Sequence, residues 1–180
     1  MMNYQSTQGA AGQTPRQWPA QARVKLDSQR DTLVMFVHPQ CACTEASLDE
    51  LNRVLARCSV NVAAQIWFFQ PVGLPTSWSQ STLRHNAAAI PTLIVQNDVG
   101  GEQARIFGAE TSGYVVLYNP GGQLLFKGGI TSSRGHEGDN FGESAIVALL
   151  SGKKSECAQT PVYGCSLFGR CQSSSATDSK

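Results

Sequence analysis

Apolar and polar residues alternate along the chain in blocks whose length and spacing mark separate strands and helices. Residues 33–37 (Leu-Val-Met-Phe-Val) are continuously apolar, as in a strand buried on both faces of a sheet. From Thr44 to Cys58, apolar residues recur every three or four positions, with acidic residues early and arginines late. This spacing and charge order predict an amphipathic helix. A second apolar run, residues 60–69, predicts another buried strand and completes a strand-helix-strand unit.

Shorter elements follow this unit. Strands are predicted at 91–96, 114–118 and 123–127, and helices at 79–89, 102–107 and 142–150. Residues 119–122 (Asn-Pro-Gly-Gly) are a strong turn signal that joins the last two strands as a hairpin. The sequence therefore predicts one α/β domain over residues 23–152, with a central mixed sheet flanked by helices. We expect a flexible arm over residues 1–22 and a loop-like, cysteine-containing tail over residues 153–180.

Composition narrows the classes of function. Charged residues are 15% of the chain and hydrophobic residues 41%, against about 25% charged in a typical soluble domain, which excludes a charge-driven disordered protein. The net charge of +1 gives no general attraction for nucleic acid or for an anionic membrane. No apolar run reaches the roughly 18 residues of a membrane span, and the polar N-terminus lacks the apolar core of a secretory signal. We expect no nucleic-acid partner, no membrane insertion, and a cytoplasmic location, or a periplasmic one if a signal has been removed.

The cysteines indicate redox or metal chemistry. Cys41 and Cys43 flank a single alanine, after the first buried strand and before the first helix. Free N–H groups and the positive dipole at a helix N-terminus stabilise a thiolate, which lowers a thiol pKa from about 8.5 to roughly 3.5–7.5. Cys41 is therefore the candidate nucleophile. Cys58 ends the helical pattern and is expected in the core.

These residues resemble a known family. The run from Phe36 to Cys41, the helix after it, the second aromatic strand, and Phe107-Gly108 before the glycine-turn hairpin resemble the thioredoxin-like superfamily, in particular its TlpA/ResA-type branch. The motifs His-Pro-x-Cys-x-Cys-Thr, Gly-Gly-Ile-Thr, Arg-Gly-His-x-Gly-Asp-Asn and Thr-Pro-x-x-Gly-Cys are similar to those of small bacterial RedB-type redoxins. The superfamily resemblance covers residues 24–152 and implies a thioredoxin-like fold with thiol-disulfide exchange at Cys41.

Two positions depart from the family pattern. The family's second cysteine falls on Thr44, so Cys43 comes one residue early, and the family's docking proline falls on Gly113. Residues two apart on a helix point away from each other. A Cys41–Cys43 disulfide therefore requires Cys41 to lie outside the first helical turn, and it would be strained and more oxidising. The resemblance implies that Ser112 and Gly113 form the loop on which substrate docks.

Other residues are candidates for auxiliary roles. Cys165 could resolve a mixed disulfide with Cys41 if the tail folds back, or it could be a spectator. In the glycine-rich loop after the last strand, Arg134 or His136 could stabilise a thiolate or carry a proton. The alternative is that this loop only turns, faces solvent and caps the last helix. His38 either stiffens its loop or lines the site.

Three functions remain open on this evidence. The first is thiol-disulfide exchange with a disulfide-containing protein or a small-molecule thiol, in which Cys41 attacks and Cys43, or else Cys165, releases the product without a cofactor. The second is a soft-metal module, in which copper or a similar ion is held by Cys41 and Cys43 together with His38, His136 or Cys165. The third is peroxide reduction at Cys41 through a sulfenic acid.

Overall fold

The structure is a computed structural model that describes residues 6–58 and 60–168. The strands are β1 (Asp31–Val37), β2 (Val62–Gln70), β3 (Leu93–Val99), β4 (Tyr114–Tyr118) and β5 (Leu124–Gly128). The helices are α1 (Thr44–Cys58), α2 (Thr82–Ala88), α3 (Glu102–Ile106) and α4 (Phe141–Leu150), with a 3-10 turn, η2 (Thr76–Ser79). Every strand and helix predicted from the sequence is present, with its ends shifted by a few residues at most.

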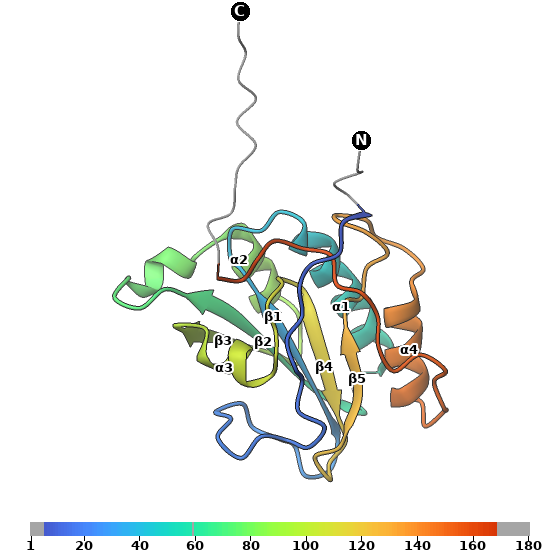
Figure 1. Cartoon of the computed structure of the whole chain (residues 1–180). Coiled ribbons are helices and arrows are strands. Elements are labelled where there is room, and N and C mark those ends of the chain that lie inside the picture. Colours follow the sequence, from blue (N-terminus) through green and yellow to red (C-terminus); the bar gives the residue numbers. More distant parts are fainter. Residues whose placement is uncertain (1–5, 59, 169–180) are drawn as a thin grey trace, which may run out of the picture.

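The strands form one mixed sheet in the order β3-β2-β1-β4-β5 (Figure 1). The central strand β1 pairs in parallel with β2 and antiparallel with β4. β4 and β5 form the predicted hairpin, in which Asn119 N–H donates to Gln123 O at 3.0 Å. The chain thus has the predicted thioredoxin-like α/β fold. The carboxyl end of β1, in the middle of the sheet, opens directly into the turn that carries Cys41.

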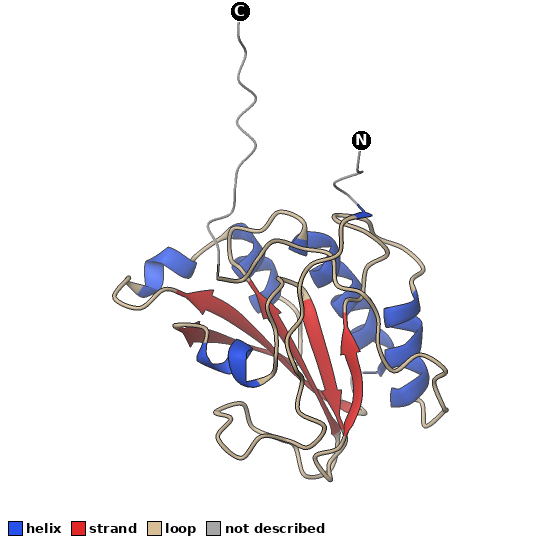
Figure 2. Ribbon diagram, in the orientation of Figure 1, coloured by secondary structure: helices blue, strands red, loops and turns tan. Residues whose placement is uncertain are grey.

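The continuous apolar run of β1 is buried on both faces, as its sequence predicts. Leu33, Met35 and Val37 belong to one core cluster, and Val34 and Phe36 belong to the other, because successive side chains of a strand point to opposite faces. The first cluster includes apolar residues of α1, α2 and α4. These helices cover one face of the sheet (Figure 2).

The second face is covered by α3 and by the two terminal segments, which have little regular structure (Figure 2). The ring of Trp18 packs edge-on against Phe107 and Tyr118, with centroid distances of 5.1 Å to each. The sequence predicts a flexible arm over residues 1–22, but in the structure its described part is packed against the sheet. The polar composition of this segment concealed the few side chains that hold it there.

The described part of the C-terminal tail, residues 153–168, has little regular structure and contributes to the core. Figure 1 shows it returning from α4 across the face that carries the N-terminal segment, and Gly9 N–H donates to Val162 O at 2.8 Å. Val162 and Leu167 are only 3% and 1% exposed. The described tail therefore packs against the domain as far as residue 168, whereas Cys171 lies outside the described residues.

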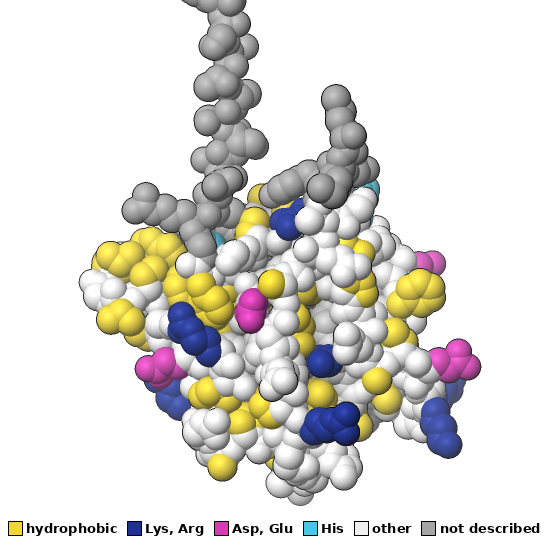
Figure 3. All heavy atoms as spheres, viewed as in Figure 1, with side chains coloured by type: hydrophobic (Ala, Val, Ile, Leu, Met, Phe, Trp, Pro, Cys, Tyr) yellow, Lys and Arg dark blue, Asp and Glu magenta, His cyan; other side chains and the backbone are white. Residues whose placement is uncertain are grey.

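The surface reflects the low charge content of the sequence. Figure 3 shows acidic and basic side chains scattered singly over the face that it presents, without a patch of one sign. This face offers no continuous basic surface of the kind that binds nucleic acid. None of the helices in the described ranges is both long enough and apolar enough to cross a bilayer.

Candidate active site

The turn between β1 and α1 places Cys41 at the end of the central strand. Cys41 N–H donates to His38 O, and Thr44 N–H donates to Cys41 O, both at 3.1 Å, so the turn closes before α1 begins. Cys41 therefore lies outside the first turn of α1, which is the condition for approach to Cys43. Cys41 is only 2% exposed, whereas Cys43 is half-buried.

Three sulfur atoms meet at this turn. The Sγ atoms of Cys41, Cys43 and Cys165 all lie within 4.8 Å of one another, and all three cysteines are free thiols. Cys165 comes from the tail, and both its thiol and its backbone amide hydrogen bond to the Cys41 sulfur. The structure thus brings the two predicted partners of Cys41 to the same place.

Hydrogen bonds to the Cys41 sulfur overcome the effect of its burial. The Cys165 thiol makes the largest contribution, and the Thr44 hydroxyl, the Cys165 N–H and the Ser112 hydroxyl add to it, while burial opposes them. Together they lower the pKa of Cys41 from 9.0 to about 5. The sequence predicts a lowered pKa from the end of the helix. The direction agrees, but the largest cause is a residue of the tail.

The hydroxyl groups of Thr44 and Ser112 form a small network beneath the thiolate. Their oxygens are 2.7 Å apart, and His38 N–H donates to the Ser112 Oγ at 2.8 Å. Two hydroxyls carry only two protons, so whenever one donates to the other, a single hydroxyl donates to the sulfur. Because the His38 amide fills an acceptor position of Ser112, it favours the orientation in which the Ser112 proton points toward Thr44 or Cys41.

Cys43 has the opposite protonation behaviour. Burial and the adjacent charge of Cys41 raise the pKa of Cys43, and the charge and hydrogen bond of Arg134 offset this only in part. At neutral pH the site therefore pairs a Cys41 thiolate with a Cys43 thiol.

The glycine-rich loop brings one of its two candidate residues to the site. Arg134 lies at the site and acts on Cys43, whereas His136 is exposed on the same loop. Asn140 caps the N-terminus of α4, since its side chain accepts a hydrogen bond from Glu143 N–H at 2.8 Å.

His38 is a buried ring that supports the turn. It is 3% exposed, and its Nδ1 accepts a hydrogen bond from Gln40 N–H at 3.2 Å. The ring stacks on Phe69 and meets Trp78 edge-on, with centroid distances of 5.9 and 5.7 Å. Burial lowers the pKa of His38 although the charge of Cys41 raises it, so the ring is neutral at neutral pH. His38 thus stiffens its loop and also borders the thiolate.

The loop predicted to dock substrate lies against the cysteine turn. Gly113 has φ +90°, its N–H donates to Phe36 O at 2.9 Å, and a Cβ there would lie 2.9 Å from Ser47 Oγ, so the position requires glycine. Ser112 N–H donates to Cys165 O at 2.8 Å. The chain's own tail therefore occupies the main-chain edge of this loop.

The hydroxyl of Ser112 is a site group that the sequence did not reveal as a hydrogen-bond donor. Its contact with Cys41 depends on a loop that is distant in the chain, and no local pattern encodes it. The one sequence feature that relates to this contact is Gly164. The tail can approach Ser112 closely only because this residue has no side chain, since a Cβ there would lie 2.1 Å from Ser112 O. A glycine before a cysteine is too common to predict such a contact.

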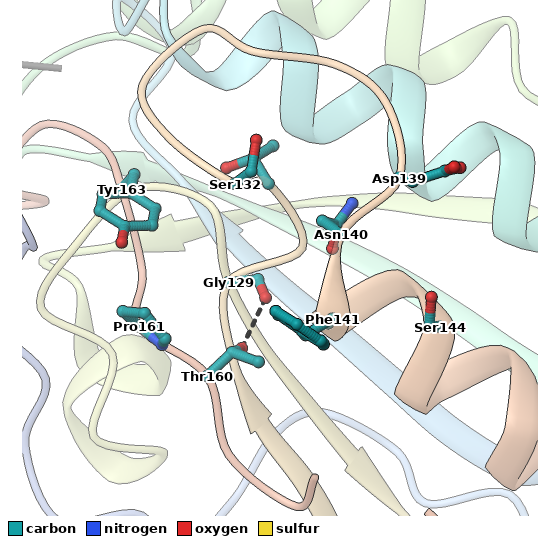
Figure 4. A pocket seen from close by; sticks show the side chains of 11 residues that line it. Gly129, Ser132, Asp139, Asn140, Phe141, Ser144, Thr160, Pro161 and Tyr163 are labelled. Carbon is teal, nitrogen blue, oxygen red and sulfur yellow. Dashed lines mark hydrogen bonds between the residues drawn. The ribbon is translucent and has the colours of Figure 1, made fainter. Parts of the chain in front are cut away.

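A pocket of about 470 Å³ lies beside the tail and is not lined by the three sulfurs. Figure 4 shows it between Thr160, Pro161 and Tyr163 of the tail on one side, and the loop after β5 with the start of α4 on the other. Thr160 Oγ1 donates to Gly129 O at 2.7 Å and joins the tail to that loop. The tail between Thr160 and Tyr163 therefore has open space on one side.

Comparisons with known proteins show the fold. No protein-family model matches the chain, and no curated protein matches it. It is similar to a solved hypothetical protein from Sinorhizobium meliloti, with TM-score 0.62 and 18% identity over 90% of this chain and 94% of that one. It is also similar to an uncharacterized conserved protein from Geobacillus kaustophilus, with TM-score 0.63 and 17% identity over 93% and 95%. A weaker likeness, with TM-score 0.48 and 12% identity over 71% and 84%, is to a secreted disulfide oxidoreductase from Mycobacterium tuberculosis. The narrower RedB-type resemblance stays a prediction.

Proposed function

We propose that this protein is a thiol-disulfide oxidoreductase whose attacking sulfur is Cys41. The observation that carries the proposal is the set of hydrogen bonds to that sulfur, which lower the pKa of Cys41 to about 5. A thiolate is the nucleophile in disulfide exchange, and the second sulfur needed to complete the exchange is within 4.8 Å.

The reaction needs only the cysteines of the chain and a disulfide. The Cys41 thiolate attacks one sulfur of the substrate disulfide, the substrate S–S bond breaks, and the released thiolate takes a proton. A second thiol of this chain then attacks the Cys41 sulfur, forms an internal disulfide and releases the other half of the substrate. The two protein thiols lose two electrons, and the substrate disulfide gains them.

The partner class follows from this chemistry. The substrate is a disulfide-containing protein, or a small-molecule disulfide and its thiol, and the proposal invokes no cofactor. Cys43 and Cys165 are both candidates for the second sulfur because both reach Cys41. Arg134 modulates Cys43 through its positive charge, and His38 holds the turn.

The proposal is tested with the reduced full chain and oxidised glutathione as the probe. We expect two protein thiols to be lost for each disulfide consumed, and both to return with dithiothreitol. Cys41→Ser should abolish the reaction, whereas Cys58→Ala should leave it unchanged, because Cys58 lies in the apolar core. Consumption of the probe by Cys41→Ser at the rate of the natural chain would overturn the proposal.

A second candidate is binding of a soft metal ion such as Cu(I), which the cluster of three sulfurs favours. Metal–thiolate bonds of about 2.3 Å allow two sulfurs on one ion to lie at most about 4.6 Å apart, close to the 4.8 Å limit seen here. The sequence predicts His38, His136 or Cys165 as the third ligand. Nδ1 of His38 accepts a hydrogen bond from Gln40 N–H, whereas the sulfur of Cys165 lies with those of Cys41 and Cys43. This supports Cys165 as the third ligand of the candidate.

This candidate is tested by anaerobic titration of the reduced chain with Cu(I) against a chromophoric Cu(I) chelator. We expect one ion per chain and weaker binding after Cys165→Ser. Cys157→Ser is the matched control, since it removes a tail thiol outside the cluster. Failure of the chain to compete with the chelator removes the metal candidate and leaves the redox proposal intact.

A further inference from the structure

Residues 162–168 of the tail run beside the loop that precedes β4 and pair with it at one isolated antiparallel bridge; we call this segment the tail strand. Ser112 N–H donates to Cys165 O at 2.8 Å, and Leu167 N–H donates to Glu110 O at 2.9 Å. Between these two hydrogen bonds the backbones form an antiparallel bridge. This is the geometry by which a peptide adds a strand to an exposed edge, and here it delivers a sulfur to Cys41.

Side chains on both sides of Cys165 anchor the strand. Val162 and Leu167 are 3% and 1% exposed within the second core cluster. The ring of Phe168 meets Phe69 edge-on at 5.9 Å, and the Arg105 guanidinium lies over the same ring at 4.2 Å. Main-chain pairing together with seated side chains is how strand-addition sites hold a peptide.

The strand leaves no space for a second one. A Cβ at Gly164 would lie 2.1 Å from Ser112 O, so the two backbones are in direct contact. Cys41 is 2% exposed, and the amide and thiol of Cys165 already contact its sulfur. An outside disulfide that docks along this edge must therefore take the place of the tail.

We propose that residues 162–168 are a displaceable strand that occupies the docking edge of an extended, disulfide-containing polypeptide substrate, and that Cys165 resolves the mixed disulfide when this strand returns. The inference rests on the proposed function and deepens it, because it names the substrate class and the second cysteine. The pocket beside Thr160 and Tyr163 gives the tail room on one side to move.

The main-chain groups at this edge select a polypeptide over a small molecule. Ser112 is fully buried, and its N–H is paired by the tail. Leaving such a buried donor without a partner is unfavourable, so an occupant that replaces the tail must supply a carbonyl at the same place. An extended peptide supplies it from its backbone.

The electrons balance over two exchange steps. The Cys41 thiolate attacks the substrate disulfide, and one substrate thiol leaves. When the tail returns, the Cys165 thiol gives up its proton, its sulfur attacks the Cys41 sulfur, and the remaining half of the substrate leaves as a thiolate that takes up a proton. The substrate disulfide is reduced, and Cys41 and Cys165 become a disulfide.

Geometry favours Cys165 over Cys43 for this second step. Cys41 and Cys43 are two residues apart in a turn that is pinned by the hydrogen bond from Thr44 N–H to Cys41 O. A disulfide across such a short ring departs from the preferred dihedral geometry and is strained. Cys165 approaches on a separate segment, so its bond to Cys41 leaves that turn intact.

The first experiment separates the second cysteine from the attacking one. The reduced natural chain and the variants Cys165→Ser, Cys43→Ser and Cys157→Ser are each mixed with an equimolar cystine-bridged peptide, quenched with acid and mapped by mass spectrometry. We expect a Cys41–Cys165 disulfide in the natural chain, in Cys43→Ser and in Cys157→Ser. Cys165→Ser should stall as a mixed disulfide on Cys41.

Two other results of this experiment would contradict either the inference or the proposed function. If Cys43→Ser stalls and Cys165→Ser completes the reaction, Cys43 resolves and this inference is wrong, although the proposed function stands. If no variant forms a mixed disulfide at Cys41, the proposed function itself fails.

The second experiment tests displacement of the strand. Gly164→Ala should push the tail away from Ser112 O and raise the limiting rate of Cys41 alkylation by iodoacetamide at alkaline pH, where the thiolate is fully formed, by about tenfold. Gly121→Ala in the β4–β5 turn is the matched control. Leu167→Ala, which loosens the same strand by losing an anchor, is the second variant should Gly164→Ala fail to fold. An unchanged rate in the folded variants would show that the tail does not shield Cys41.

The substrate class is tested with a peptide of residues 161–168 (Pro-Val-Tyr-Gly-Cys-Ser-Leu-Phe), carried as a disulfide with cysteamine. We expect it to react about tenfold faster than the same peptide with alanine in place of its glycine, because the alanine blocks strand pairing. Equal rates for both peptides and for oxidised glutathione would overturn strand docking and leave the exchange function standing.

Discussion

The two ends of α1 each carry a cysteine, and their environments are opposite. Cys41 precedes the helix, and hydrogen bonds from Cys165, Thr44 and Ser112 lower the pKa of Cys41 to about 5. Cys58 is the last residue of the helix, packed in the first core cluster, where burial raises the pKa of Cys58 and the charge of Arg57 only partly offsets it. The same residue type is thus a thiolate at one end and an inert apolar thiol at the other.

This difference shows that position on the helix alone does not set the pKa of a thiol. The helix dipole favours a thiolate at the N-terminus and disfavours one at the C-terminus. The largest stabilisation of Cys41, however, comes from Cys165 on the tail, and Ser112 adds to it from the loop before β4. The low pKa of Cys41 therefore depends on separate segments of the chain that converge on its sulfur.

The largest expected effect is loss of the low-pH thiolate. The ultraviolet absorbance of thiolate in the reduced chain should show a step near pH 5, since the pKa of Cys41 is lowered to about 5. Cys41→Ser should remove the whole step, and Cys58→Ala should keep it. A step that survives Cys41→Ser would assign the thiolate to another cysteine and break the comparison.

Removing the hydroxyl groups beside Cys41 should have a smaller effect on its pKa. The double variant Thr44→Val with Ser112→Ala removes both hydroxyls that can donate to the Cys41 sulfur, and with them the one hydrogen bond that either of them makes to it at a time. It should raise the pKa of Cys41 by about 1–2 units, because a hydrogen bond to a charged group contributes about 1.5–3 kcal/mol. The absorbance titration measures this shift. Thr44→Ser, which retains a hydroxyl, is the control and should shift it far less. A titration that does not move would mean that the hydroxyls do not donate to the sulfur.

The pH dependence of stability should also separate the two ends. The folded-state pKa of Cys41 lies below that of an unfolded thiol, so the stabilisation is complete above about pH 9 and is lost as the pH falls through about 5. The free energy of unfolding of the reduced natural chain, minus that of Cys41→Ser, should therefore rise over this range in urea titrations. A difference that stays flat with pH contradicts the lowered pKa.

The smallest effect is expected at the other end of the helix. Cys58→Ala removes a buried sulfur from the core and should lower the free energy of unfolding by about 1 kcal/mol, a typical value for a single core substitution. The rate of exchange with oxidised glutathione should not change. Urea denaturation and the exchange assay, applied to the same preparation, check both expectations. A slower exchange would give Cys58 a role that its burial argues against.

Local sequence determined most of the fold. The apolar run 33–37 predicts a strand buried on both faces, the three- and four-residue spacing from Thr44 to Cys58 predicts α1, and the Asn-Pro-Gly-Gly turn predicts the β4–β5 hairpin; all three are present. Each of these signals is contained in a short window, because side-chain periodicity and turn chemistry act between near neighbours. The same windows placed Cys41 at the corner between strand and helix.

Tertiary structure alone decided what surrounds Cys41 and what covers the second face of the sheet. The hydroxyl of Ser112, the sulfur of Cys165 and the ring of Trp18 reach their partners through contacts between segments far apart in the chain. Such contacts leave no periodic trace, since each depends on one or two side chains in otherwise polar, irregular segments. They form only after the sheet has brought the ends of its strands together, which is why the sequence predicted a reactive cysteine and the fold supplied the groups that ionise it.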